Sequence, residues 1–162
     1  MKKPEIIVEP ITSAQIGQLD NIMLLFFAYR DFTGDADRLL AELEFGRAHH
    51  RVMFFINRKP GLSVAELLEI LGITKQSLAR VLRQLIDEGY VYQRMGKRDR
   101  RKRLLFPTDL CRDLIYDLSV FQSTRIEKAL TGLSAEKREV VSDFLTEMID
   151  VEGRKNLRKL MP

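Results

Sequence analysis

The stretch from Ser63 to Gly89 constrains the fold most, because it carries the local signals of two helices separated by a very short turn. Ser63 and Glu66 have the spacing of a capping box, in which the two residues satisfy each other's backbone N–H groups at the start of a helix. Gly72 can adopt the left-handed conformation that commonly ends a helix, and Thr74 suits the N-cap of the next one. Helices joined by so short a turn must cross steeply.

The second of these predicted helices has one apolar face and one polar face. Its apolar residues, between Leu78 and Ile86, repeat at the three-and-four spacing of a buried stripe. The opposite face carries basic groups that can bind phosphate, together with Gln and Arg side chains that can reach base edges. The candidate DNA-contacting residues of this helix are Thr74, Lys75, Gln76, Ser77, Arg80 and Arg83.

Two short strands joined by a basic loop follow this helix. The segments from Tyr90 to Met95 and from Arg103 to Phe106 contain β-branched and aromatic residues typical of strands. The loop between them, residues 96–102, reads GKRDRRK. The order helix, turn, helix, strand, basic loop, strand predicts a winged helix-turn-helix. The candidate DNA-contacting residues of the wing are Arg94, Lys97, Arg98, Asp99, Arg100 and Arg101.

Positive charge is concentrated in this winged element. The chain of 162 residues has a formal net charge of +4, whereas residues 75–103 alone contain ten Lys and Arg against three acidic residues. A charged helix face or a basic loop by itself is usually only solvated. Because the two are adjacent here, we expect the element to bind nucleic acid.

From Phe45 through Thr108 the chain resembles the MarR family of bacterial and archaeal transcription regulators, and the flanking helical segments fit that family's dimerisation helices. The most specific shared motif is the Asp-x-Arg of the wing, present here at residues 99–101 and followed by an apolar strand. The resemblance implies that Asp99 orients Arg101 through an ion pair and that Arg101 enters the minor groove. An Arg held in this way loses less freedom on binding, and a narrow minor groove concentrates negative potential.

Helical segments are also predicted before the winged element. A capping box at residues 12–15 predicts a helix that continues to about Tyr29, followed by a loop over 30–34 and a short helix over 36–43. Residues 22–28, IMLLFFA, are apolar without a break, so the first helix must be covered on all sides. We expect a second copy of the chain as the cover; the alternative is a central helix in a monomeric core.

The remaining segments complete a mainly α fold with a small antiparallel β-wing. A helix over residues 47–58, stopped by Pro60 and Gly61, is expected to open the DNA-binding lobe. A long helix over 108–131 and a last helix from Ala135 follow the wing, with a basic tail expected to be a solvated or packed end. The expected organisation is a single chain, 1–162, with a DNA-binding lobe at 35–107 and dimerisation helices at 12–34 and 108–162.

Other classes of function find little support in the sequence. We recognise no Gly-rich phosphate loop, nucleophile elbow or acid/base constellation, so neither an enzyme nor a cofactor is expected. His49 and His50 are the only histidines, and neighbours on a helix point about 100° apart, so we expect no metal site. One of them is expected to line a pocket or cap a helix. The single cysteine, Cys111, stands where the MarR family often has Gly and cannot form an internal disulfide. With no apolar run of membrane-spanning length, a cytoplasmic protein is expected.

The sequence therefore predicts a homodimeric regulator that binds double-stranded DNA with sequence specificity. Two-fold symmetry requires a palindromic operator whose half-sites lie about 34 to 36 Å apart. The resemblance implies repression and a response to a small-molecule effector, held between the dimer arms and the DNA-binding lobe. The candidate ligand-binding residues are Phe27, Arg30, His50 and Phe54. The competing interpretation is a winged-helix module that uses the same face to bind an acidic protein partner.

Overall fold

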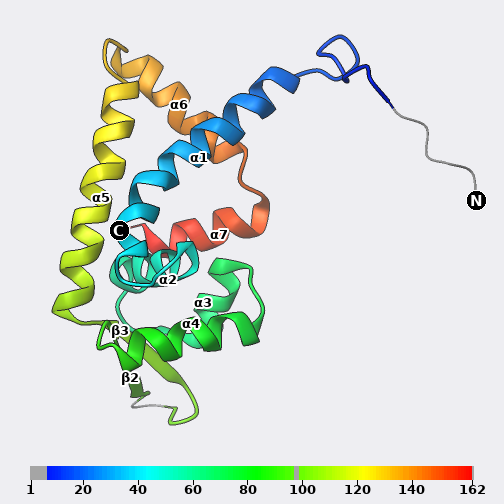
Figure 1. Ribbon diagram of the computed structural model, residues 1–162. Helices are drawn as coiled ribbons and strands as arrows, with labels where there is room; N and C mark the ends of the chain where they lie inside the picture. The colour runs from blue at the N-terminus through cyan, green and yellow to red at the C-terminus, as the bar shows by residue number, and fades with distance from the viewer. Residues whose placement is uncertain (1–6, 97–98, 162) are drawn as a thin grey trace, which may run out of the picture.

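The computed structural model describes residues 7–96 and 99–161 and shows a mainly helical chain with one small sheet, which confirms the predicted fold class (Figure 1). The sheet is antiparallel, with strand order β1-β3-β2. Within the described ranges, no helix combines the length and apolarity needed to cross a membrane. The elements in chain order are α1 (Leu19–Ala41), α2 (Arg47–Arg58), β1 (Leu62–Ser63), α3 (Val64–Leu71), α4 (Lys75–Asp87), β2 (Val91–Met95), β3 (Arg103–Pro107), α5 (Asp109–Ala129), α6 (Ala135–Glu147) and α7 (Val151–Leu160).

Helices α3 and α4 form the predicted helix-turn-helix, and the local signals that predicted it are present. The Ser63 N–H donates to Glu66 Oε2 at 2.8 Å, and the Glu66 N–H donates to Ser63 Oγ at 3.3 Å. Gly72 ends α3 with a φ of 61°. The Ser77 N–H donates to Thr74 Oγ1 at 3.2 Å, so Thr74 caps α4 as expected.

The wing is the hairpin of β2 and β3, and a third strand completes the sheet. The hairpin pairs Val91 with Pro107 at its base and Met95 with Arg103 near its tip. Strand β1 pairs with β3 next to the start of α3. The sequence does not predict β1, because two residues are too few to show an alternating pattern.

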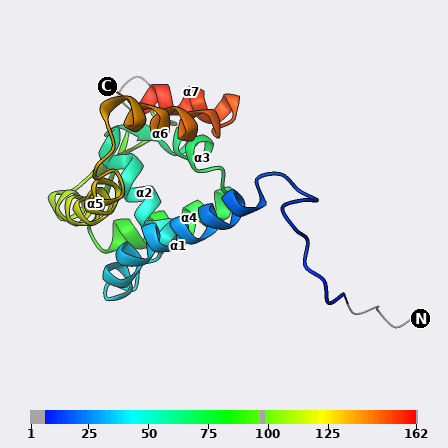
Figure 2. The same ribbon diagram turned by 90° about the horizontal axis from the view of Figure 1, so that it is seen from above.

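Helix α2 lies at the centre of one hydrophobic core (Figure 2). Its residues Val52, Met53 and Ile56 are fully buried, as are Leu85 of α4 and Leu105 of β3. The same helix contacts α1, α3, α4, α5 and β3. Helix α2 therefore connects the helix-turn-helix to the flanking helices.

The predicted loop over residues 30–34 is wrong, because α1 runs through it as one continuous helix. Thr33 Oγ1 donates to the carbonyl four residues earlier at 3.0 Å, an arrangement that helical backbone accommodates. Gly34 costs only about 1 kcal/mol inside a helix. Ala36 and Leu40 are completely buried in the core, and their burial outweighs that cost. The predicted boundary of the DNA-binding lobe at residue 35 therefore falls inside α1.

The predicted start of the first helix is wrong as well. The Thr12 N–H donates to Gln15 Oε1 at 2.9 Å, so the capping contact itself forms. It closes only an isolated turn, because Gln18 has a φ of 64° and α1 begins one residue later. Ile11 and Ile16 remain exposed. Without apolar burial, a local capping contact does not propagate into a helix.

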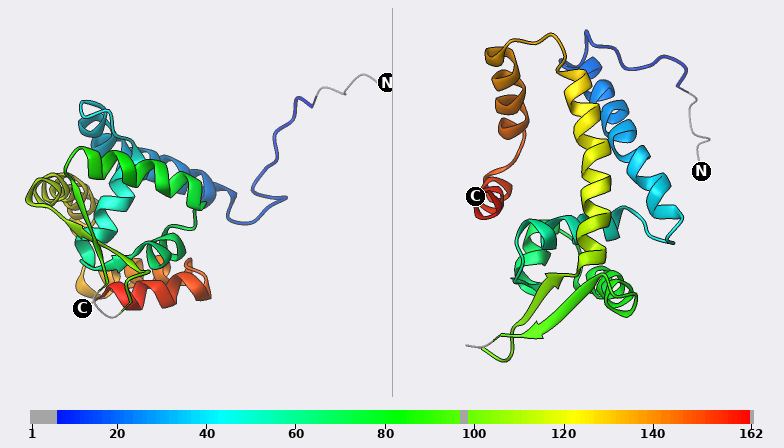
Figure 3. Two further views of the ribbon diagram at one scale, coloured as in Figure 1. Left: turned by 90° about the horizontal axis from the view of Figure 1, so that it is seen from below. Right: turned by 90° about the vertical axis from the view of Figure 1, so that its left-hand side faces the viewer.

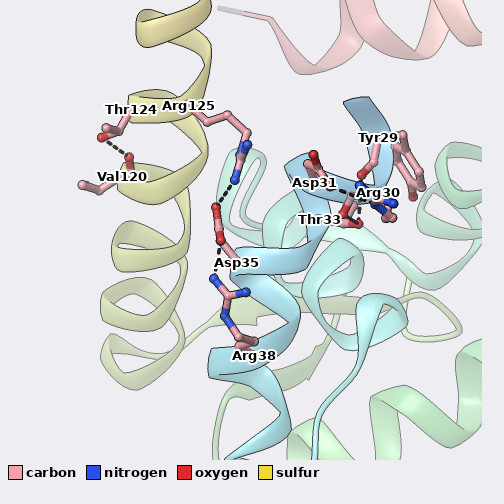
Figure 4. A network of polar contacts seen from close by, with 9 residues as sticks. All are labelled: Tyr29, Arg30, Asp31, Thr33, Asp35, Arg38, Val120, Thr124 and Arg125. Atoms are coloured by element: carbon pink, nitrogen blue, oxygen red, sulfur yellow. Dashed lines mark hydrogen bonds and ion pairs between the residues drawn. The ribbon is translucent and has the colours of Figure 1, made fainter. Parts of the chain in front are cut away.

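Helices α1 and α5 lie side by side and are joined at the surface by an ion pair (Figures 3 and 4). An Arg125 amino group of α5 donates to Asp35 Oδ2 of α1 at 2.7 Å, and Arg38 binds the other carboxylate oxygen. The hydrogen bond from the Arg125 guanidinium holds the pKa of the Asp35 carboxyl below its usual range. The two helices that flank the winged lobe are thus connected to each other as well as to α2.

The basic C-terminal tail forms α7, which packs against α3 (Figure 2). Asn156 is 6% exposed, and its Nδ2 donates to the Glu69 carbonyl of α3 at 3.4 Å. Leu160 is also buried. The Arg154 side chain fixes the turn before α7 by donating to the Ile149 carbonyl at 2.8 Å. The tail is therefore a packed end, one of the two outcomes expected from the sequence.

Candidate nucleic-acid interface

Helix α4 presents a polar face to solvent because its apolar stripe is fixed in the core. Leu78, Val81, Leu82 and Leu85 are each at most 6% exposed. The stripe therefore determines which residues point outward. All of the candidate residues on this helix are exposed, namely Thr74, Lys75, Gln76, Ser77, Arg80 and Arg83.

The basic side chains of this face are available to a ligand. Within residues 7–96 and 99–161, no ion pair within 4.0 Å involves Lys75, Arg80 or Arg83. Their charges are therefore not neutralised by carboxylates of the described chain. Such a face attracts phosphate, and its Arg and Gln groups match base edges in the major groove.

The wing begins with a steric requirement for glycine. A Cβ added at Gly96 would lie 2.7 Å from the Asp99 carbonyl oxygen. The turn is closed by the Gly96 N–H, which donates to the Lys102 carbonyl at 2.9 Å, and by the Lys102 N–H, which donates to the Asp99 carbonyl at 3.1 Å. Arg94 is held on the hairpin face, with its guanidinium 4.4 Å from the centre of the Phe106 ring.

The expected ion pair between Asp99 and the Arg101 side chain is absent among the described residues. Asp99 Oδ1 instead accepts a hydrogen bond from the Arg101 backbone N–H at 3.0 Å. A short Asp side chain reaches a backbone N–H two residues on more easily than a distant guanidinium. Arg100 and Arg101 are exposed at the tip. The two remaining wing candidates, Lys97 and Arg98, lie outside the described residues.

Helix α4 and the wing lie at the same end of the molecule, away from α6 and the start of α1 (Figures 1 and 3). The exposed basic residues of α4 and of the hairpin tip therefore belong to elements at the same end of the molecule. A helix with basic residues beside a basic β-hairpin can contact a duplex in two neighbouring grooves.

One contact of α4 was not predicted from the sequence. His49 Nε2 of α2 lies 2.8 Å from Gln84 Oε1 of α4, and His49 Nδ1 accepts the N–H of Gly46 at 3.1 Å. One of the two histidines thus caps a helix, as expected. A histidine three residues after a helix-starting Gly is a usable sequence signal for such a cap, but its contact with Gln84 depends on how α2 and α4 cross.

The other histidine, His50, lines a cavity of about 240 Å³ beside α1, α2 and α5. His50 Nε2 is buried and has no hydrogen-bond partner among the described residues. Burial lowers the pKa of His50, an effect that Asp37 partly opposes. The residues that line the cavity are Tyr29, Phe32, Thr33, Arg47, His50, Arg51, Phe54, Phe55 and Gln122.

The four candidate ligand-binding residues are divided between two places. His50 and Phe54 share this cavity, whereas Phe27 and Arg30 lie beside Phe26 in a separate hollow on α1. The Arg30 guanidinium stacks on Phe27, 4.7 Å from the centre of its ring. For metals, no cluster of three or more His, Cys, Asp or Glu side chains occurs within the part of the chain that the structure describes.

A helix-turn-helix with a basic outer face, a β-hairpin beside it and a common core defines a winged-helix DNA-binding protein. Known sequences agree with this class. The chain is 45% identical over 139 residues to the HTH-type transcriptional regulator PetP of Rhodobacter capsulatus, a match that covers 86% of this chain and 84% of PetP. A model of the MarR family matches residues 44–102. The chain belongs to the MarR family of transcriptional regulators and is a DNA-binding protein.

Solved structures share the fold over nearly the whole chain. Streptococcus pneumoniae FabT, in a crystal structure in complex with DNA, superposes with a TM-score of 0.70 at 20% identity, covering 89% of this chain and 99% of FabT. A MarR protein from Peptoclostridium difficile superposes with a TM-score of 0.67 at 21% identity, covering 98% of this chain and 99% of that protein. The fold therefore extends beyond the winged lobe to the flanking helices.

Proposed function

We propose that the protein is a homodimeric, sequence-specific repressor that binds a palindromic operator and responds to a small molecule. The observation that carries this proposal is the separation of two surfaces. The basic face of α4 and the wing lie at one end of the molecule, and an exposed apolar surface of α1 and α6 lies at the other. A two-fold axis through the apolar end places two DNA-binding faces in one dimer.

The exposed apolar surface of α1 and α6 supports dimerisation, because its apolar area is too large to remain in contact with water. In the single chain, Leu24 is 63% exposed and Phe26 72% exposed on α1, and Phe144 is 55% exposed on α6. Residues of both helices, Phe144 among them, line a shared hollow of about 560 Å³ together with Met148, the residue after α6. Exposed apolar patches of this kind mark protein–protein contacts. A second copy is the occupant that would cover residues 22–28, which are apolar without a break.

On DNA, α4 would lie in the major groove and the wing in the adjacent minor groove. We assign base reading to Gln76 and Arg80, near the middle of the polar face, and phosphate binding to Lys75 and Arg83. Bound at a promoter, such a dimer excludes other proteins from that site, which is the proposed route to repression. Since its target is the genome, we place the regulator in the cytoplasm.

The cavity beside α2 is the proposed effector site. Four of its nine lining residues are Tyr or Phe and two are Arg, and His50 Nε2 offers one buried polar atom that lacks a partner among the described residues. A small molecule with an aromatic body and one polar group fits that lining. Helix α2 also contacts α4, so a ligand in this cavity could alter the position of α4. It can do so only if it binds the DNA-bound and the released conformations of the dimer with different affinities.

Selection of bound DNA from a random pool, followed by titration of the selected site and of random DNA, tests the proposal. A palindromic consensus and a sedimenting species of two chains per site are expected. The variant Gln76→Ala should lower the preference for the selected site over random DNA by about 1 to 3 kcal/mol. Its control Arg83→Ala should weaken binding to both DNAs equally. Monomeric binding, or retention by an acidic protein but by no DNA, would refute the proposal.

A further inference from the structure

The contact between His49 and Gln84 is directional, and its direction can be assigned. His49 Nδ1 accepts the Gly46 N–H, so the ring proton of the neutral imidazole is on Nε2. Nε2 therefore donates to Gln84 Oε1, at 2.8 Å. The assignment also orients the Gln84 amide, whose oxygen must face α2. The bond thus fixes both the position of the His49 proton and the orientation of the Gln84 amide.

An aromatic ring also holds the imidazole by packing against its face. Phe45 stacks on the His49 ring, with ring centres 4.9 Å apart and planes 17° apart. Phe45 in turn meets the edge of Tyr90, the residue before β2, at 5.0 Å. Phe45 is 5% exposed and Tyr90 7% exposed. Because the donor ring cannot turn freely, its hydrogen bond acts as a fixed reference point for α4.

No other side-chain hydrogen bond joins α4 to a different element within residues 7–96 and 99–161. The rest of the attachment of α4 comes from its apolar stripe, and apolar burial is not directional. The stripe keeps α4 on the core and determines which face points outward. The hydrogen bond of Gln84 adds a directional contact that can fix the remaining rotation of the helix.

A small rotation is enough to affect reading. A helix with its side chains has a radius of about 5 to 6 Å, so a rotation of about 10° moves its outer surface by about 1 Å. Productive binding geometry must hold to about 0.5 Å. Arg80 lies one helical turn before Gln84, so any rotation at Gln84 displaces it as well. Contacts with phosphate tolerate such a shift better than bidentate contacts with bases.

We propose that His49 and Gln84 are positioning residues that fix the rotation of α4 and so set the preference for operator over random DNA. Neither side chain is assigned a contact with DNA. The inference rests on the proposed sequence-specific binding, since a rotation matters only if bases are read.

The experiment compares the full-length wild type with Gln84→Met, which keeps the length of the side chain but removes the acceptor, and Gln84→Glu, which keeps an oxygen acceptor. The probes are the DNA selected from a random pool by the wild type and a random duplex of the same length. The Met variant should lower the operator-to-random affinity ratio about twofold to tenfold, the range expected for one hydrogen bond. The Glu variant should keep the ratio, although its added charge weakens binding to both DNAs.

Two further proteins separate positioning from general destabilisation. Asn57 of α2 donates to Cys111 Sγ of α5 at 3.1 Å and forms no hydrogen bond with α4 among the described residues, so Asn57→Leu should lower the melting temperature and leave the ratio unchanged. The double variant His49→Phe/Gln84→Met should lose no more of the ratio than Gln84→Met alone, because both changes remove one bond.

An unchanged ratio in Gln84→Met, or an equal loss in Asn57→Leu, would overturn the positioning role while leaving sequence-specific binding intact. A wild type that binds operator and random DNA equally would refute the proposed function itself.

Discussion

The role of Asp99 in the wing can be decided with two substitutions at the same position. In the structure its carboxylate accepts the Arg101 backbone N–H at 3.0 Å, so its contribution is to hold the turn rather than to hold the guanidinium. Asp99→Asn keeps an oxygen acceptor for that N–H and removes the negative charge. Asp99→Ala removes both. The two variants therefore separate the shape of the loop from its charge.

The expected sizes follow from one hydrogen bond and one charge. Loss of the turn contact in Asp99→Ala should weaken operator binding about fivefold, the equivalent of one hydrogen bond of about 1 kcal/mol. Asp99→Asn should bind the operator at least as tightly as the wild type, because a negative charge is removed near phosphate. Arg101→Ala should lower the slope of log affinity against log salt by about 0.9, which is about 3.5-fold between 50 and 200 mM salt.

Fluorescence anisotropy titrations of labelled operator at several salt concentrations measure all three effects, and thermal unfolding controls for folding. The refuting result would be an Asp99→Asn protein that binds as weakly as Asp99→Ala. In that case the carboxylate charge, and with it an ion pair formed on DNA, would be what matters. If both variants bound more tightly than the wild type, the wing would act only as a cationic patch.

Three further variants test other parts of the molecule. Phe26→Glu places a charge on the exposed apolar face of α1 and should give monomers by sedimentation with operator affinity reduced more than tenfold, whereas a persistent dimer would contradict the assigned interface. Burial raises the pKa of Cys111 to about 11, so the thiol stays protonated near pH 8; iodoacetamide should react slowly with the native protein, and peroxide should not release the protein from DNA. Release by peroxide that the Cys111→Ser variant no longer shows would contradict this expectation. Burial lowers the pKa of His50, so the unfolded chain binds its proton first; the free energy of unfolding should fall as the pH drops below 6.5, and His50→Phe should flatten that fall in chemical denaturation measured from pH 7 to 5.5.

The elements whose signals are local could be predicted from the sequence. Ser63, Gly72 and Thr74 set the ends of α3 and α4 through contacts within a few residues, and these ends lie where they were predicted. The alternation of apolar and basic residues in α4 likewise specified its outward face, because a buried stripe at helical spacing leaves only the opposite side for solvent.

Where local and distant interactions compete, the outcome depends on how the whole chain packs. Gly34 favours a break, yet α1 continues through it because Ala36 and Leu40 are buried against the core. At Thr12 the local cap forms without any burial to extend it, and no helix follows until Leu19. Local signals alone therefore predict a cap but not whether a helix propagates from it.

The two histidines show the same division at the level of single side chains. Adjacent positions on a helix point in different directions, so the sequence predicted that the two histidines would not bind one metal ion together. Only the crossing of α2 with α4 placed His49 against Gln84, and only the packing of α1 and α5 enclosed His50. The direction of a side chain follows from the helical period, which can be read from the sequence. The residue that it contacts depends on which helix the folded core places opposite to it.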